Sequence, residues 1–357
     1  MEVNVRRLWL AVVSVAVLMI GCGGQGVPTG SPMGSPAGSP ADSPAGSPTA
    51  PPLTRLTVGL GYIPSVQFAQ FYRAQVQGYY EAAGLDVTFQ NGDDANLITL
   101  IAQGANDIGI ADGTSVIPAV GQDIPIRYVA TIYAQFPNVV ITAADSGIET
   151  VADLRGRSLG IPGPYGSSWI MLQALLSLED MTTADIVERD YPDYGQGVAL
   201  QQGQVDAATA FRNNEPVQLG LAGFETVQFT VDDIVPLPGP GLIVGTSTLA
   251  SKPDALRAFV AATLRAMREI SENPEAGLDD AIAFVPELGA AADRATQLAI
   301  LEATVEMWRS TLTDEEGLGA IDEGGWNYSL SFMEDLPGSN IPDKVTVDDL
   351  ITTELLP

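Results

Sequence analysis

Short apolar runs alternate along the chain with longer amphipathic runs, and this pattern predicts strands that alternate with helices. The strand-like runs are rich in branched residues and lie at 56–60, 85–89, 107–111, 126–132, 158–161, 205–211 and 242–244. Helix-like runs start near residues 66, 95, 112, 150 and 169, and longer amphipathic runs occupy 251–270, 276–285 and 292–310. The alternation predicts an α/β fold built on open, mostly parallel sheets with helices on both faces. In such sheets a ligand binds beyond the carboxyl ends of the strands.

The first 21 residues have the pattern of an export signal. Arg6 and Arg7 precede an apolar run at 8–20, and Cys22 follows almost at once. That run is too short to cross a hydrocarbon core of about 30 Å and is typical of a signal peptide. Residues 19–22 (Met-Ile-Gly-Cys) resemble the bacterial lipobox, so we expect 1–21 to be a lipoprotein signal peptide and Cys22 to be lipidated. The alternative is a secretory signal with an incidental exposed cysteine.

Residues 22–53 form a second region, in which Ser-Pro pairs recur among glycines and alanines. Such a segment has little to bury, so we expect it to be disordered with local polyproline-II character. A flexible chain of this length spans roughly 30 Å between its ends. We interpret the region as a tether between the lipidated cysteine and the folded body. A cell-wall-associated or O-glycosylated stalk is the alternative interpretation.

The charge balance and the missing residue types exclude several functions. The 357 residues carry 16 Lys and Arg against 44 Asp and Glu, a formal net charge of −28, which disfavours nucleic acid as a partner. The sequence has no histidine, which removes histidine-based acid–base catalysis and the commonest transition-metal ligand. Cys22 is the single cysteine, so neither a disulfide within the chain nor a CxxC metal site can form. We therefore expect no resident cofactor and no metal site.

Three segments carry a resemblance to a known family. Residues 78–87 (GYYEAAGLDV), 104–110 (GANDIGI) and 151–160 (VADLRGRSLG) resemble, in order and spacing, motifs of type II periplasmic substrate-binding proteins of ABC importers. The subfamily is the one that binds thiamine pyrimidine precursors and riboflavin, and it is related to nitrate, sulfonate and taurine binders. The resemblance implies a two-lobed clamp with the ligand cleft between the lobes. It implies a first lobe at 54–145 and 239–357, a second lobe at 146–238, and closure about segments near 142–147 and 236–245.

Loops expected at the cleft supply the candidate ligand-binding residues. The aromatic rings suited to stacking on a flat heteroaromatic ligand are Tyr62, Phe68, Tyr165, Trp169, Tyr194 and Phe211. The candidate hydrogen-bonding residues are Gln67, Asp112, Thr114, Ser167, Ser168, Asn213 and Glu215. Phe68 and Trp169 are equally compatible with ordinary core packing.

The candidate residues give opposite indications of the charge that the ligand carries. The expected helix starts at Thr114 and Ser168 favour a carbonyl or an anion, because backbone N–H groups are unpaired there. Arg212 also favours an anionic ligand, whereas Glu215 opposes one. A pair between Arg212 and Glu215 would cancel both indications.

The segment at 61–69 (GYIPSVQFA) distinguishes between ligands within the subfamily. It resembles the GYIPxVQFAPFY opening of riboflavin binders more than the WxPNxxHxxxY opening of pyrimidine binders, although Gln70 replaces the usual proline. The resemblance is thus closest to bacterial riboflavin-binding lipoproteins and implies riboflavin as the transported ligand. A thiamine pyrimidine precursor of the formylaminopyrimidine or hydroxymethylpyrimidine type is the alternative, and a sulfonate or nitrate is less favoured.

An enzymatic role is a different class of function, and the sequence disfavours it. Relatives in this fold that make the thiamine pyrimidine consume an active-site histidine, which this chain lacks. A Ser-Lys hydrolase could use only Lys252 or Lys344, and Lys252 is expected within a capping box at the start of the 251–270 helix. Acidic pairs at 93–94 and 232–233 are expected to be solvated surface. A receptor ectodomain is disfavoured because no transmembrane pattern leads to a cytoplasmic output.

These observations together predict a binding protein that performs no chemistry. We expect a monomer held by the lipid on Cys22 at the outer face of the cell membrane, with a small heteroaromatic molecule as its ligand. The permease of an ABC importer is the expected protein partner.

Overall fold

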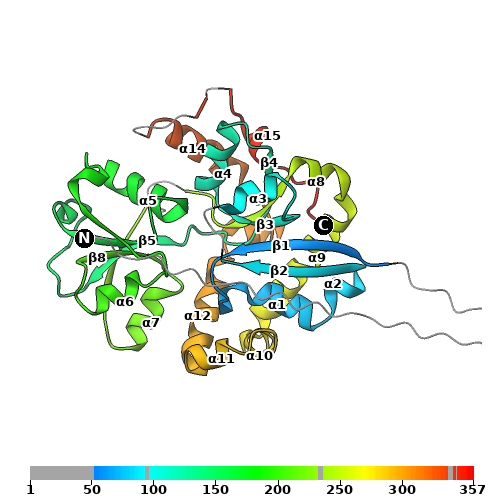
Figure 1. Ribbon diagram of the computed structural model, residues 1–357, viewed down its shortest axis with the longest axis horizontal. Helices are drawn as coiled ribbons and strands as arrows, with labels where there is room; N and C mark the ends of the chain where they lie inside the picture. The colour runs from blue at the N-terminus through cyan, green and yellow to red at the C-terminus, as the bar shows by residue number, and fades with distance from the viewer. Residues whose placement is uncertain (1–51, 93–95, 232–235, 337–340, 343) are drawn as a thin grey trace, which may run out of the picture. The chain divides into compact units, whose positions relative to one another are not determined.

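The computed structural model of the chain contains two five-stranded β-sheets flanked by helices (Figure 1). It describes residues 52–92, 96–231, 236–336, 341–342 and 344–357. The predicted signal peptide, Cys22, the tether up to residue 51 and the acidic pairs at 93–94 and 232–233 lie outside the described residues. We call each sheet with its helices a lobe.

The first sheet has the strand order β2-β1-β3-β10-β4. β1 is parallel to both of its neighbours, whereas β10 is antiparallel to β3 and to β4. The strands are β1 (Thr54–Gly61), β2 (Leu85–Asn91), β3 (Ile108–Ala111), β4 (Ile126–Thr131) and β10 (Gly241–Gly245). β10 therefore brings the chain back to the first sheet from the second.

The second sheet repeats this arrangement in the order β7-β6-β8-β5-β9. β6 is parallel to β7 and β8, and β5 is antiparallel to β8 and β9. The strands are β5 (Asn138–Ala143), β6 (Ser158–Ile161), β7 (Val187–Asp190), β8 (Ala207–Phe211) and β9 (Thr226–Thr230). The predicted class of open, mostly parallel sheets is confirmed. The sequence pattern does not predict β5, β7 or β9.

Helices cover both sheets (Figure 1). Those of the first lobe that precede β4 are η1 (Val66–Phe68), α1 (Ala69–Val76), α2 (Tyr79–Ala82), α3 (Leu97–Ala102) and α4 (Gly113–Gly121). Those between β5 and β9 are η3 (Val151–Leu154), α5 (Gly166–Ser177), η4 (Thr183–Asp185), α6 (Gln196–Gln201) and α7 (Glu215–Leu221). Those after β10 are α8 (Thr246–Ser251), α9 (Pro253–Glu272), α10 (Pro274–Phe284), α11 (Leu288–Ala291), α12 (Arg294–Met307), α13 (Thr311–Glu316), α14 (Glu323–Glu334) and α15 (Val347–Leu350).

The first sheet is buried on both faces, because successive side chains of a strand point to opposite sides. On β10, Leu242 and Val244 join a core cluster that contains Phe259 of α9. Ile243, between them, joins a different cluster that contains Trp326 of α14. The two clusters therefore lie on opposite faces of the same sheet, and helices from the end of the chain complete both.

Helix α9 buries the apolar stripe that the sequence predicts. The residues of this stripe are fully buried: Leu256, Phe259, Val260, Leu264, Met267 and Ile270. The spacing of i, i+3 and i+4 puts them on one face of a helix. The sequence pattern thus identifies the helix and the face that it packs against the first sheet.

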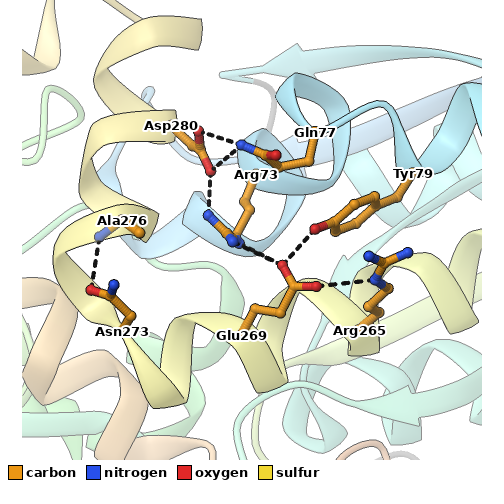
Figure 2. A network of polar contacts seen from close by, with 8 residues as sticks. All are labelled: Arg73, Gln77, Tyr79, Arg265, Glu269, Asn273, Ala276 and Asp280. Atoms are coloured by element: carbon orange, nitrogen blue, oxygen red, sulfur yellow. Dashed lines mark hydrogen bonds and ion pairs between the residues drawn. The ribbon is translucent and has the colours of Figure 1, made fainter.

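A polar network holds α9 and α10 against α1 and α2 (Figure 2). Arg73 of α1 donates to Glu269 of α9 at 2.8 Å and to Asp280 of α10 at 2.5 Å. The Tyr79 hydroxyl of α2 also donates to Glu269, at 2.5 Å, and Arg265 lies over the Tyr79 ring, 3.8 Å from its centroid. The Arg73 side chain is only 14% exposed, so it makes these ion pairs in a partly desolvated setting.

The start of α9 differs from the predicted capping box. Helix α8 occupies 246–251, so Lys252 rather than Ser251 is the N-cap of α9, and its side chain makes no capping hydrogen bond. The Lys252 ammonium group instead donates to Asp107 at 2.7 Å. Pro253 follows at the first helical position, where its missing N–H is not needed. Lys252 therefore links α9 to the start of β3, and its amine is engaged in an ion pair.

The chain crosses between the lobes at 132–137 and again after β9. β5 lies in the second sheet, so the first crossing comes before the boundary expected at residue 145. The two crossing segments touch, because Ile132 and Tyr133 both donate their backbone N–H to the Pro240 carbonyl. A Cβ atom at Gly239 would lie 2.3 Å from the Tyr133 carbonyl oxygen, so this close approach requires glycine.

Candidate functional site

A cavity of about 190 Å³ lies between the lobes, at the edge where the parallel strands of both sheets end. From the first lobe, Tyr62, Asp112 and Tyr133 line it, and they follow β1, β3 and β4. From the second lobe, Tyr165 follows β6 and Phe211 ends β8. The cavity therefore occupies the position expected for a ligand of open α/β sheets.

Most of the predicted ligand-binding residues line this cavity. They are Tyr62, Gln67, Phe68, Asp112, Tyr165, Ser167, Ser168, Tyr194, Phe211 and Glu215. The other four lie beside it: Thr114 is fully buried, Trp169 packs against the core of the second lobe, Arg212 donates to Thr230, and Asn213 joins the two lobes.

Aromatic side chains form one part of the lining. The rings of Tyr62 and Tyr194, one from each lobe, meet edge to face with centroids 4.6 Å apart. Tyr165 is 37% exposed and Phe68 is 9% exposed, so rings line both the mouth and the depth of the cavity. Tyr194 has a φ of 60°, which costs a non-glycine residue about 1–2 kcal/mol. Backbone strain of this kind concentrates at functional sites.

A buried amide network joins the lobes at the edge of the cavity. Asn213 Nδ2 donates to Gln67 Oε1 at 2.9 Å and to Thr304 Oγ1 at 2.8 Å. Gln67 Nε2 in turn donates to Ser65 Oγ at 3.1 Å. Both polar atoms of the Gln67 side chain are thus engaged within the protein. Gln67 therefore lines the cavity and also holds the side chains of Ser65 and Asn213 in place.

Two carboxyl groups contribute to the lining, one from each lobe. Asp112 is 5% exposed, caps α4 by accepting from the Ser115 N–H at 3.0 Å, and accepts from the Thr114 hydroxyl at 2.5 Å. Burial raises the pKa of Asp112, and these hydrogen bonds only partly offset it. Burial likewise raises the pKa of Glu215, which accepts from the Phe211 N–H at 2.9 Å.

Neutral hydrogen-bonding groups complete the lining. Asn138 Nδ2 donates to both Ser167 Oγ and Ser168 Oγ, at 3.1 and 3.0 Å, and thereby orients the first turn of α5. Gln196 is 3% exposed, and its Nε2 donates to the Thr209 carbonyl at 3.2 Å. Among the described residues the Gln196 Oε1 atom has no hydrogen-bond partner. This amide oxygen is therefore a free acceptor in the cavity wall.

Several residues that line the cavity are not among the ligand-binding residues predicted from the sequence. They are Leu60, Leu97, Ile98, Ile110, Ala111, Ser115, Tyr133, Pro162, Gly166, Gln196, Ala210, Asn214 and Pro240. Tyr133 could have been found, because it directly follows the predicted 126–132 strand. Gln196 belongs to α6, which the sequence pattern does not predict, so nothing in the sequence indicated that Gln196 lies at the cavity.

Within the described ranges, no group of three or more Asp, Glu, Cys or His residues is arranged to hold a metal ion. Across the same ranges, no helix is both long and apolar enough to cross a membrane.

Comparisons with known proteins can be placed on this geometry. Residues 65–277 match the family model described as "NMT1/THI5 like". The chain is 32% identical over 313 residues to "Riboflavin-binding protein RibY" of Chloroflexus aurantiacus, covering 86% of this chain and 87% of that protein. It is 24% identical over 230 residues to "4-amino-5-hydroxymethyl-2-methylpyrimidine phosphate synthase" of Legionella pneumophila, covering 62% of this chain and 71% of that enzyme.

Solved structures agree on the fold. The alkanesulfonate-binding protein SsuA of Xanthomonas axonopodis pv. citri, bound to MOPS, has a TM-score of 0.65 at 16% identity, covering 85% of this chain and 100% of that one. Identity this low supports the shared fold alone. The family match and the similarity to the riboflavin-binding protein show that this chain belongs to the NMT1/THI5-like family, and the arrangement of the two sheets together with this structural likeness shows that it has the type II periplasmic-binding-protein fold.

Proposed function

We propose that the protein is the substrate-binding component of an ABC importer and that it captures riboflavin in the cavity between its lobes. The observation that carries the proposal is the set of rings from both lobes, Tyr62, Phe68, Tyr165, Tyr194 and Phe211, around one cavity. The similarity to a riboflavin-binding protein over most of both chains supports the same ligand.

The chemistry of the lining suits a flat, uncharged ring system. Each stacking contact between aromatic rings adds about 0.5–1.5 kcal/mol beyond the burial of apolar area. The Tyr62 and Tyr194 centroids are 4.6 Å apart, so a ring inserted between them would require the lobes to separate and close again. Riboflavin also brings N–H and hydroxyl donors, which the Gln196 Oε1 atom and the carboxyl groups of Asp112 and Glu215 could accept.

The predicted N-terminal lipid anchor and tether suit a protein that delivers its ligand to a permease. The lipid on Cys22 would hold the protein at the outer face of the cell membrane, and the tether at 22–53 would let the two lobes search the nearby volume. Ligand-driven closure would create the face that the permease binds, because a ligand that contacts both lobes favours the closed form. We propose that the protein acts as a monomer.

We propose binding without catalysis. The similarity to a pyrimidine phosphate synthase covers 62% of this chain, and the chain has no histidine that could be consumed. The amine of Lys252 is engaged by Asp107, so it is not a free base for a Ser-Lys hydrolase.

A thermal-shift experiment with three ligand classes tests the proposal. A ligand at 100 times its dissociation constant stabilises the folded protein by about 2.7 kcal/mol, which raises the melting temperature by about 5 °C for a chain of this size. We expect riboflavin to produce this shift and formylaminopyrimidine and MOPS to produce none. A shift with formylaminopyrimidine or MOPS, and none with riboflavin, would reject riboflavin as the ligand.

A further inference from the structure

The charged side chains that line the cavity are all acidic in the part of the chain that the structure describes. They are Asp112 of the first lobe and Glu215 of the second, and neither lysine nor arginine is among the lining residues. Arg212 is the neighbour of Phe211, but its guanidinium group donates to Thr230 and is not part of the lining. A ligand in this cavity therefore meets one carboxyl group from each lobe and no basic side chain.

Asp112 is held in place by neutral donors. Its Oδ1 atom accepts from the Ser115 N–H at 3.0 Å and from the Thr114 hydroxyl at 2.5 Å. The Ser167 side chain of the second lobe also lowers the pKa of this carboxyl group, though less than burial raises it. A hydroxyl or N–H donor orients a carboxylate without cancelling its charge. Because Asp112 is only 5% exposed, water screens that charge weakly.

Glu215 is fixed in a similar way on the opposite wall. One carboxylate oxygen accepts from the Phe211 N–H at 2.9 Å. Its side chain lies against α6, where a Cβ atom at Gly197 would come within 3.0 Å of Glu215 Cγ. The glycine therefore leaves the space that this side chain occupies.

We propose that Asp112 and Glu215 make the cavity selective for the neutral flavin and against its phosphorylated form, riboflavin 5′-phosphate. The inference rests on the proposed function and adds to it the charge of the substrate and the two residues that read it. Riboflavin hydroxyl and N–H groups donate to carboxylates, and such charge-assisted hydrogen bonds are stronger than neutral ones. A phosphate group instead adds a charge of about −1.5 to −2 at pH 7 and only acceptor oxygens. Burial raises the pKa of both carboxyl groups, so they repel the phosphate at pH values above their raised pKa values, where the weakly screened cavity makes the repulsion strong.

The test compares the two flavins on the purified full-length protein by isothermal titration calorimetry at pH 7. We expect riboflavin 5′-phosphate to bind at least tenfold more weakly than riboflavin. In Glu215→Gln and in Asp112→Asn this ratio should fall severalfold, because each substitution removes a charge and keeps an oxygen that accepts the existing hydrogen bonds. Asparagine is also a good N-cap, so α4 keeps its start.

Two exposed acids serve as controls for net charge. Glu81 of the first lobe and Glu225 of the second are outside the cavity, and Glu81→Gln and Glu225→Gln should leave the ratio unchanged. Equal binding of the two flavins to the wild-type protein would overturn the inference and leave the proposed function intact. A ratio that neither cavity variant changes would overturn the assignment to Asp112 and Glu215. Failure of both flavins to bind would reject the proposed function, and the inference with it.

Discussion

Asn213→Ala should weaken the contact between the two lobes. The Asn213 Nδ2 atom donates to Gln67 Oε1 at 2.9 Å and to Thr304 Oγ1 at 2.8 Å, and both acceptors belong to the first lobe. Gln67 Oε1 would lose this partner while buried, at a cost of about 1–3 kcal/mol. The loss of the hydrogen bond to Thr304 costs less, about 1 kcal/mol of the free energy of unfolding, because the Thr304 hydroxyl still donates to the Ile300 carbonyl. The free energy of unfolding should fall by about 2–4 kcal/mol in total.

Differential scanning calorimetry measures this loss as a drop in melting temperature. At about 2 °C per kcal/mol for a chain of this size, Asn213→Ala should melt about 4–8 °C below the wild type. Asn214→Ala is the matched control, because the Asn214 side chain accepts from Gln218 within the second lobe, at 2.7 Å. The free energy of unfolding of this control should fall by about 1 kcal/mol. If Asn213→Ala melts within about 1 °C of the wild type, or if both variants show the same drop in melting temperature, Asn213 does not stabilise the contact between the lobes.

Substitutions of the cavity rings, of the polar network of α9 and of the lipidated cysteine should each have a distinct effect. Tyr62→Ala and Tyr165→Ala should each weaken riboflavin binding about 5- to 150-fold in calorimetry without changing the circular dichroism spectrum, and unchanged affinity in both would move the site elsewhere. Arg73→Ala should lower the free energy of unfolding at pH 7 by about 2–3 kcal/mol in urea titrations, because it breaks two partly buried ion pairs. Burial alone would raise the pKa of Glu269, but hydrogen bonds from Tyr79, Arg265 and Arg73 outweigh it and lower that pKa. The stabilisation is therefore fully present above the ordinary glutamate pKa and should disappear as the pH falls through the lowered pKa of Glu269. A difference in the free energy of unfolding between Arg73→Ala and the wild type that grows in acid would contradict this. Cys22→Ser should release the protein from the membrane fraction, and retention after normal signal cleavage would argue against lipid anchoring.

The strands that bear strong apolar runs could be predicted, and with them part of the site. Tyr62, Asp112 and Phe211 lie at or just past the ends of such strands, so the rule for open sheets was enough to group them. β7 and β9 carry no comparable signal, because they lie at the edges of the second sheet and their side chains are partly exposed. β5 is an exception, because it is buried and apolar and yet is not among the predicted strands, and nothing in its local pattern assigns it to the second sheet rather than the first.

Helix phase explains why Trp169 is not in the cavity lining. Helix α5 starts at Gly166 rather than near 169, so Ser167 and Ser168 stand at its open end. One further residue turns the helix by about 100°, and Trp169 packs against the core of the second lobe. Thr114 also lies outside the lining: it is fully buried, and its hydroxyl donates to Asp112.

The bridge through Asn213 could not be predicted from the sequence. Its partners Gln67 and Thr304 lie 146 and 91 residues away along the chain. Only the packing of α12 and η1 beside α7 brings the three side chains together.

A fluorescence titration of riboflavin with the purified protein measures directly whether riboflavin binds between the two lobes. Stacking on the cavity tyrosines should quench flavin fluorescence, with one flavin bound per chain and a dissociation constant below about 1 µM. Tyr328→Ala replaces an exposed tyrosine outside the cavity and should give the same curve as the wild type. Unquenched riboflavin fluorescence at protein concentrations up to about 100 µM would contradict the account.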